Sequence, residues 1–165
     1  MIETERLYLR NMNKDDAEAI FEIWGNPKVN KYLWEPLYSS ADEVRNIIPD
    51  NYNGPNHALV IIQKDLGKII GACGIVPDDL ENEWELGYCL KPEYWGYGYA
   101  TEVINAFMRL AIEKGVTALF AEVAVDNAQS IKILEKNGFK VYRDSELTKG
   151  DGSMTFKSKI YRMIL

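Results

Sequence analysis

The chain is poor in the residues that build disulfide frameworks and zinc sites. Its 165 residues include two cysteines, Cys73 and Cys89, and one histidine, His57. A disulfide framework needs more cysteine, and a His-pair zinc motif needs a second histidine. Both cysteines lie in apolar stretches, KIIGACGIV and ELGYCL, where a free thiol behaves as a small buried side chain. We therefore expect no disulfide framework and no metal, and we expect Cys89 to be structural.

Long apolar runs and an excess of basic charge are also missing. No run approaches the roughly 18 apolar residues that span a bilayer. The opening MIETERLYLR carries charge where a signal peptide would be apolar. The net charge of -6 disfavours a nucleic-acid partner and favours a cationic one such as an amine. We expect a cytoplasmic protein that binds neither membrane nor nucleic acid; the sequence leaves a homodimer open.

Hydrophobic periodicity predicts a single α/β domain over residues 1–165. Strands are predicted at 6–10, 58–64, 68–76, 84–90 and 118–125 and in a hairpin formed by 139–146 and 155–165, and helices at 14–24, 41–48, 100–114 and 126–138. A short helix and loop should occupy 25–40, with turns at 50–56 and 77–83. The strand, helix and strand from 84 to 125 form a crossover, so these two strands should be parallel. The prediction is a mixed, mostly antiparallel sheet flanked by helices.

The stretch YWGYGYATE, from Tyr94 to Glu102, has two glycines among aromatics between a strand and a helix. Free N–H groups and the helix dipole favour an anion there. A dinucleotide-binding fingerprint would need glycine at Thr101, and the Gly-Lys-Ser/Thr of a P-loop is absent. The stretch alone fits a phosphate cradle and an aromatic-packed turn equally well.

A larger constellation resembles the GNAT N-acetyltransferase superfamily. It consists of WELGYCLKPEYWGYGYATEVI and, about thirty residues later, VDNAQSIKILEKNGF. The opening ETERLYLR resembles the branch typified by bacterial ribosomal-protein N-terminal acetyltransferases. The resemblance covers essentially the whole chain and implies acetyl-CoA as co-substrate, without a metal. It also implies that the parallel strands splay apart, with a bulge in 84–90, where the thioester sits.

The resemblance implies a set of residues that bind acetyl-CoA. The signature glycine and alanine correspond to Gly98 and Ala100, whereas Trp95 departs from the usual Gln or Arg. The implied contacts are Trp95, Gly96, Tyr97, Gly98, Tyr99, Ala100 and Thr101 around the pyrophosphate, the Leu90 N–H as oxyanion donor, and Asn127 toward pantetheine. We expect Asp126 to cap the helix that follows; Asn127 as a mere cap is the alternative.

Two residues match the catalytic positions of the family. Glu85 is the candidate general base, directly or through water; the alternative is a solvent-exposed strand glutamate. Ser130 is the candidate acid toward the leaving thiolate; the alternative is a hydrogen bond to its own helix. Many relatives use a tyrosine as the acid, but this helix contains none.

The resemblance places the acceptor amine near Trp34, Glu35 and Tyr38, which alternatively are core or lid packing. A peptide N-terminus, with a pKa of about 7.7 to 8.0, is easier for a single carboxylate base to deprotonate than a lysine side chain with a pKa of about 10.4. We therefore favour N-acetylation of a protein or peptide N-terminus. Polyamines, aminoglycosides and amino acids stay open as acceptors, and a non-catalytic acyl-CoA-binding module is the alternative of another class.

Overall fold

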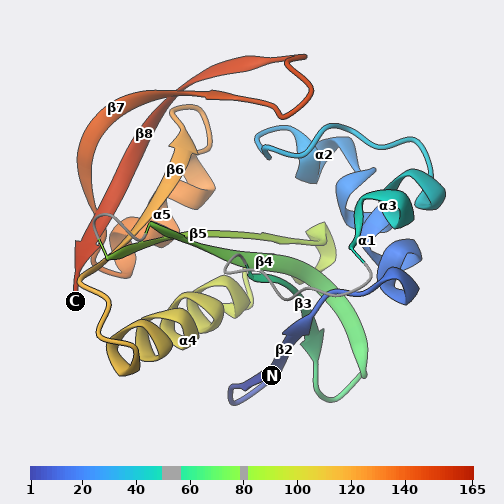
Figure 1. Ribbon diagram of the computed structural model, residues 1–165, viewed down its shortest axis with the longest axis horizontal. Helices are drawn as coiled ribbons and strands as arrows, with labels where there is room; N and C mark the ends of the chain where they lie inside the picture. The colour runs from blue at the N-terminus through green and yellow to red at the C-terminus, as the bar shows by residue number, and fades with distance from the viewer. Residues whose placement is uncertain (50–56, 79–81) are drawn as a thin grey trace.

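The computed structural model describes residues 1–49, 57–78 and 82–165 (Figure 1). Its strands are β1 (Ile2–Glu3), β2 (Leu7–Asn11), β3 (His57–Gln63), β4 (Lys68–Asp78), β5 (Glu83–Leu90), β6 (Ala118–Ala124), β7 (Lys140–Thr148) and β8 (Thr155–Ile164). Its helices are η1 (Lys14–Asp16), α1 (Ala17–Trp24), α2 (Pro27–Asn30), α3 (Ala41–Ile47), η2 (Pro92–Tyr94), α4 (Tyr99–Glu113) and α5 (Ala128–Lys136). The turn predicted at 50–56 lies outside the described residues, and the one at 77–83 lies partly outside them.

The strands form one sheet in the order β1-β2-β3-β4-β5-β6-β8-β7. Neighbours from β1 to β5 and from β6 to β7 are antiparallel, and β5 and β6 are parallel. The predicted fold class is therefore confirmed. The predicted helix at 14–24 is interrupted, because the Asn13 capping box closes a 3-10 turn before α1 begins.

Alternating strand residues send side chains to two apolar cores. Ile61 and Leu86 pack with Val103 and Phe107 of α4, whereas Val60 packs with α1 and α3 on the other face. Figure 1 shows α4 and the α1–α3 group on different sides of the sheet. None of the helices in the described ranges is long and apolar enough to cross a membrane.

The parallel strands β5 and β6 part after a short ladder. They pair at three positions, Glu83 to Glu85 with Ala118 to Phe120. β6 remains paired with β8 over Ala118–Ala124, and β5 keeps one register against β4 from Glu83 to Leu90. The predicted bulge in β5 is therefore wrong, because the pairing of β5 with β4 has no register shift. Because β5 stays paired with β4 and β6 stays paired with β8, the two strands separate beyond Glu85 and Phe120, and the sheet opens between them.

Candidate active site

The glycine stretch forms a loop and the start of α4. Gly96 and Gly98 have φ angles of 82° and 83°, the left-handed region that side chains disfavour. The helix ladder begins with the Glu102 N–H, which donates to the Gly98 carbonyl at 3.1 Å. The amides of Tyr99, Ala100 and Thr101 come before that bond, so they can bind an anion at the positive end of the helix dipole.

The aromatic residues of this stretch hold the loop in place. The Trp95 indole N–H donates to the Leu90 carbonyl at 2.8 Å, which ties the loop to the end of β5. The Tyr99 ring lies 6.1 Å from the Tyr97 ring and 4.5 Å from the Arg6 guanidinium carbon. Trp95 thus has a structural task at the position where the signature has Gln or Arg.

The N-terminal segment anchors the same loop through Glu102. The Glu102 carboxylate accepts hydrogen bonds from Thr4 Oγ1 at 2.6 Å, Arg6 N at 2.7 Å and Arg6 Nε at 2.8 Å. Arg6 Nη1 also donates to the Tyr97 carbonyl at 2.9 Å. The sequence ETERLYLR indicated a family resemblance but not this contact with Glu102.

The gap between β5 and β6 exposes backbone groups of β5. The Lys91 N–H donates to the Ile70 carbonyl of β4 at 2.9 Å. Because N–H directions alternate along an antiparallel strand, the Cys89 N–H also faces β4, and the N–H groups of Tyr88 and Leu90 face the gap. The Leu90 N–H therefore has the direction that an oxyanion donor needs.

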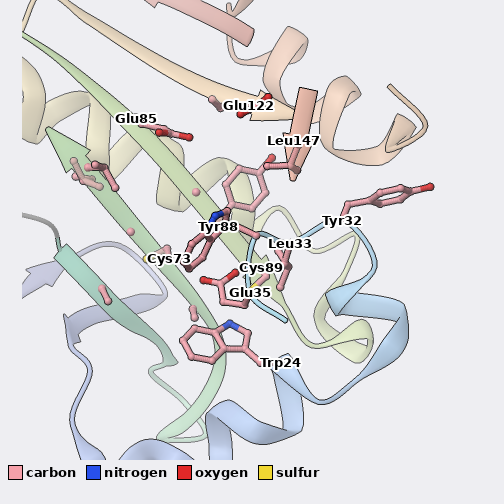
Figure 2. A pocket seen from close by; sticks show the side chains of 18 of the residues that line it. Trp24, Tyr32, Leu33, Glu35, Cys73, Glu85, Tyr88, Cys89, Glu122 and Leu147 are labelled. Carbon is pink, nitrogen blue, oxygen red and sulfur yellow. The ribbon is translucent and has the colours of Figure 1, made fainter. Parts of the chain in front are cut away.

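A cavity of about 730 Å³ connects this gap with the loop after α2. Five of the predicted catalytic and acceptor residues and the predicted pantetheine contact line it: Glu85, Ser130, Trp34, Glu35, Tyr38 and Asn127. Figure 2 shows Glu35 and Glu85 approaching it from different elements. The structure thus gathers side chains from β5, α5 and the segment after α2 around one space.

Glu85 has the environment of a base with an elevated pKa. Burial raises the pKa of its carboxyl, and the nearby charge of Glu122 on β6 raises it further. Both side chains line the cavity (Figure 2). Glu122 was not predicted, because only the three-dimensional pairing of β5 with β6 brings it near Glu85.

Ser130 lies at the start of α5, beside a tyrosine that the sequence analysis missed. The Tyr88 hydroxyl and Ser130 Oγ are 3.2 Å apart. Burial raises the Tyr88 pKa, and the hydrogen bond with Ser130 opposes the rise. Asn127 is the N-cap, since its Oδ1 accepts from the Ser130 N–H at 3.3 Å; the predicted Asp126 cap is wrong. The sequence signal for Tyr88 was the alternation in β5, which puts it on the same face as Leu86, the face that packs against α4.

The three acceptor candidates occupy different surroundings. Trp34 is 61% exposed, although it also lines the cavity. Burial raises the pKa of the Glu35 carboxyl. The Tyr38 ring lies 5.9 Å from the Trp24 ring, so it has a packing role as well as a place in the cavity wall.

Cys73 is buried and Cys89 is partly buried, and both thiols have raised pKa values. Burial raises the pKa of Cys89 to about 12 and raises that of Cys73 well above its usual value. A protonated thiol is a poor nucleophile. Among the described residues, no group of three or more His, Cys, Asp or Glu side chains could hold a metal ion.

Comparisons with known proteins agree on one family. A family model, the acetyltransferase (GNAT) domain, matches residues 6–140. The N-acetyltransferase p20 of Bacillus licheniformis is 33% identical over 160 residues, which cover 89% of this chain and 88% of p20. The crystal structure of spermidine N-acetyltransferase from Vibrio cholerae, in complex with CoA and spermine, has a TM-score of 0.79 at 20% identity and covers 96% of this chain and 95% of its own. RimL, a ribosomal L7/L12 alpha-N-protein acetyltransferase in complex with coenzyme A, has a TM-score of 0.82 at 18% identity, over 98% and 96%.

The Glu102 anchor predicts a pH-dependent contribution to stability. Burial raises the pKa of Glu102, but the bonds from Thr4 and Arg6 outweigh it and lower the pKa below its ordinary 4.5. A lowered carboxyl pKa adds stability above the ordinary value, and this stability is lost as pH falls through the lowered value. We expect Glu102→Gln to reduce the free energy of unfolding by about 1–2 kcal/mol at pH 7, measured by urea denaturation. The difference from wild type should shrink toward pH 3; a constant difference would contradict the ionic anchor.

Proposed function

Because the chain belongs to the acetyltransferase (GNAT) family, we propose that it transfers acetyl from acetyl-CoA to a primary amine by direct attack. The resemblance predicted from the sequence is confirmed, and so is the assignment as an acetyltransferase. The observation that carries the proposal is the cavity, which places Glu85 and Ser130 around the gap between β5 and β6.

The loop and the gap provide two sites for acetyl-CoA. The amides from Gly96 to Thr101 bind the pyrophosphate at the start of α4. The outward N–H and carbonyl groups of β5 pair with the pantetheine arm, as a neighbouring strand would. Asn127, which lines the cavity beside Ser130, is the side-chain contact of that arm.

Two side chains and one backbone N–H group supply the base, the acid and the oxyanion donor that the transfer needs. Glu85 accepts a proton from the acceptor's ammonium group, directly or through water, and the neutral amine that results attacks the thioester carbonyl. The Leu90 N–H donates to the oxyanion that forms on the thioester carbonyl. Ser130, with the Tyr88 hydroxyl at 3.2 Å, donates the proton to the leaving thiolate. A thiol has a pKa of about 8.5, so the thiolate needs only modest help.

Our favoured acceptor is a protein or peptide N-terminus, since a single carboxylate base suits an α-amino group. Small amines, polyamines among them, are the second candidate. The observation that favours them is that Glu35 and Glu122 line the same cavity as Glu85, so a second ammonium would find a carboxylate there. Among the solved structures with a similar fold, RimL is a ribosomal L7/L12 alpha-N-protein acetyltransferase and the Vibrio cholerae protein is a spermidine N-acetyltransferase.

We further propose that residues 1–165 form one N-acetyltransferase domain, because the sheet includes strands from both ends of this chain. The two free thiols fit a protein of the reducing cytoplasm.

The function is tested with two amines, trialanine with a free N-terminus and spermidine. Purified protein is incubated with acetyl-CoA and either amine, thiol release is followed, and the product is identified by mass spectrometry. We expect turnover on at least one of them, with trialanine the better acceptor. Saturable acetyl-CoA binding without turnover on either amine would instead support the non-catalytic module.

The cradle predicts a specific effect of Gly98→Glu. The carboxylate would stand at the start of α4, where it repels the pyrophosphate, so the KM for acetyl-CoA should rise at least about tenfold. Gly115→Glu is the matched control: Gly115 also has a positive φ, of 72°, but follows the other end of α4. Both variants should lower the melting temperature, and only Gly98→Glu should raise the KM. Equal KM values would remove Gly98 from the cradle.

The base assignment predicts two different pH profiles. The raised pKa of Glu85 means that its basic form is lost as pH falls through a value above the ordinary 4.5, which produces an acid limb in kcat/KM. Glu85→Gln should lower kcat about 100-fold near pH 8 and remove this limb. Glu122→Gln removes one cause of the raised pKa and should move the limb to lower pH. If Glu85→Gln keeps the wild-type limb, Glu85 is not the base.

A further inference from the structure

A lysine outside the catalytic elements lies buried beneath the acceptor wall. Lys149 stands in the turn between β7 and β8 and is 5% exposed. Its ammonium Nζ donates to four oxygens: the Asn30 carbonyl at 2.8 Å, Asn30 Oδ1 at 2.9 Å, the Leu33 carbonyl at 2.9 Å and the Glu35 carbonyl at 3.0 Å. Lysine is rarely buried without such partners, and three ammonium protons are fully engaged by this set.

The four oxygens belong to one irregular segment, residues 30–36. Beyond the end of α2 this segment is neither helix nor strand, so no ladder fixes its backbone. The Asn30 side chain bridges it internally, with Nδ2 donating to the carbonyls of Glu35 at 3.1 Å and Pro36 at 2.9 Å. Lys149 therefore attaches the segment to the β7–β8 turn at several points.

Two further contacts join the same turn and hairpin to the segment. The Gly150 N–H donates to the Trp34 carbonyl at 2.8 Å, and a Cβ on Gly150 would lie 2.7 Å from the Trp34 ring. The Tyr32 ring meets the Phe156 ring of β8 edge-on at 5.5 Å. In Figure 1 the tip of the β7–β8 hairpin reaches over toward α2 and the loop that follows it.

The segment forms one wall of the cavity. Tyr32, Leu33, Trp34 and Glu35 all line it, and Figure 2 shows Leu33 and Glu35 near Cys89 of β5, whereas the Tyr32 ring points away from them. The carbonyl that Lys149 binds on Glu35 belongs to the same residue whose carboxylate meets the cavity. The acetyl-CoA side, by contrast, is built from β5, β6 and the starts of α4 and α5.

We propose that Lys149 is a positioning residue for the acceptor: its ammonium group holds segment 30–36 in the shape that presents Leu33 and Glu35 to the amine. This inference rests on the proposed function. A neutral side chain at position 149 would leave buried carbonyl oxygens without a donor, and the segment would shift to reach water. The consequence falls on acceptor binding because the lysine touches the wall and not the acetyl-CoA side.

The test compares Lys149→Met with Lys157→Met, which removes an exposed lysine from β8 of the same hairpin. With the better of trialanine and spermidine, Lys149→Met should raise the acceptor KM about tenfold, the loss of one charge-assisted hydrogen-bond set. The KM for acetyl-CoA should stay at the wild-type value. Hydrogen exchange of the amides in 30–36 should become faster in Lys149→Met and stay unchanged in Lys157→Met.

A second variant keeps the test decisive if Lys149→Met does not fold. Asn30→Ala retains the lysine but removes one of its four acceptors together with the two bonds that Asn30 Nδ2 donates within the segment, so it should raise the acceptor KM in the same direction. A folded Lys149→Met or Asn30→Ala protein with the wild-type acceptor KM overturns the positioning role. A wild-type protein that acetylates neither amine contradicts the proposed function instead.

Discussion

The parting of β5 and β6 is the constraint on which the rest of the site depends. A strand inside a sheet normally has both edges paired, and buried N–H and carbonyl groups without partners are costly. Here the ladder with β6 ends at Glu85, and the Leu90 carbonyl at the far end of this edge accepts from the Trp95 indole, while β4 pairs with the other edge of β5 without interruption. A ligand with its own amides can complete that edge. The gap thus interrupts the pairing of the sheet and at the same time provides a preformed binding surface.

The pairing of β5 with β6 just before the gap explains the electrostatics of the cavity. Glu85 pairs with Phe120, so Glu122, two residues further along β6, lies on the same face of the sheet as Glu85, and both side chains line the cavity. Like charges at short range disfavour ionisation, and burial acts in the same direction. A carboxylate with a raised pKa is a better proton acceptor for an ammonium group than one in bulk water. The sheet geometry therefore prepares the base as well as the binding surface.

The sequence predicted the regular elements well because their signals are local. Alternation and helical spacing identified the meander, the crossover and α4, and the glycine pair marked the loop before α4. The alternation in β5 also separated the face of Leu86 from that of Cys89. The sequence could not predict the features that depend on contacts between distant segments. These are the Tyr88–Ser130 pair, Glu122 beside Glu85, and the absence of a register shift in β5. The sequence left the cap open between Asp126 and Asn127 for a smaller reason, since the two residue types are equally good caps, and the structure has Asn127.

Two irregular segments bind the substrates in this proposal, and each is held by bonds between a charged side chain and residues that lie far away in the chain. Glu102 fixes the cradle loop to Thr4 and Arg6, and Lys149 fixes the acceptor wall to the β7–β8 turn. A loop has no ladder, so its backbone carbonyls and N–H groups must be satisfied singly, and charged groups make the strongest such bonds. Concentrating the attachment in one buried side chain leaves the other residues of the loop free to contact ligands. This division explains why Trp34 and Tyr97 can be exposed on segments whose backbones are nevertheless fixed.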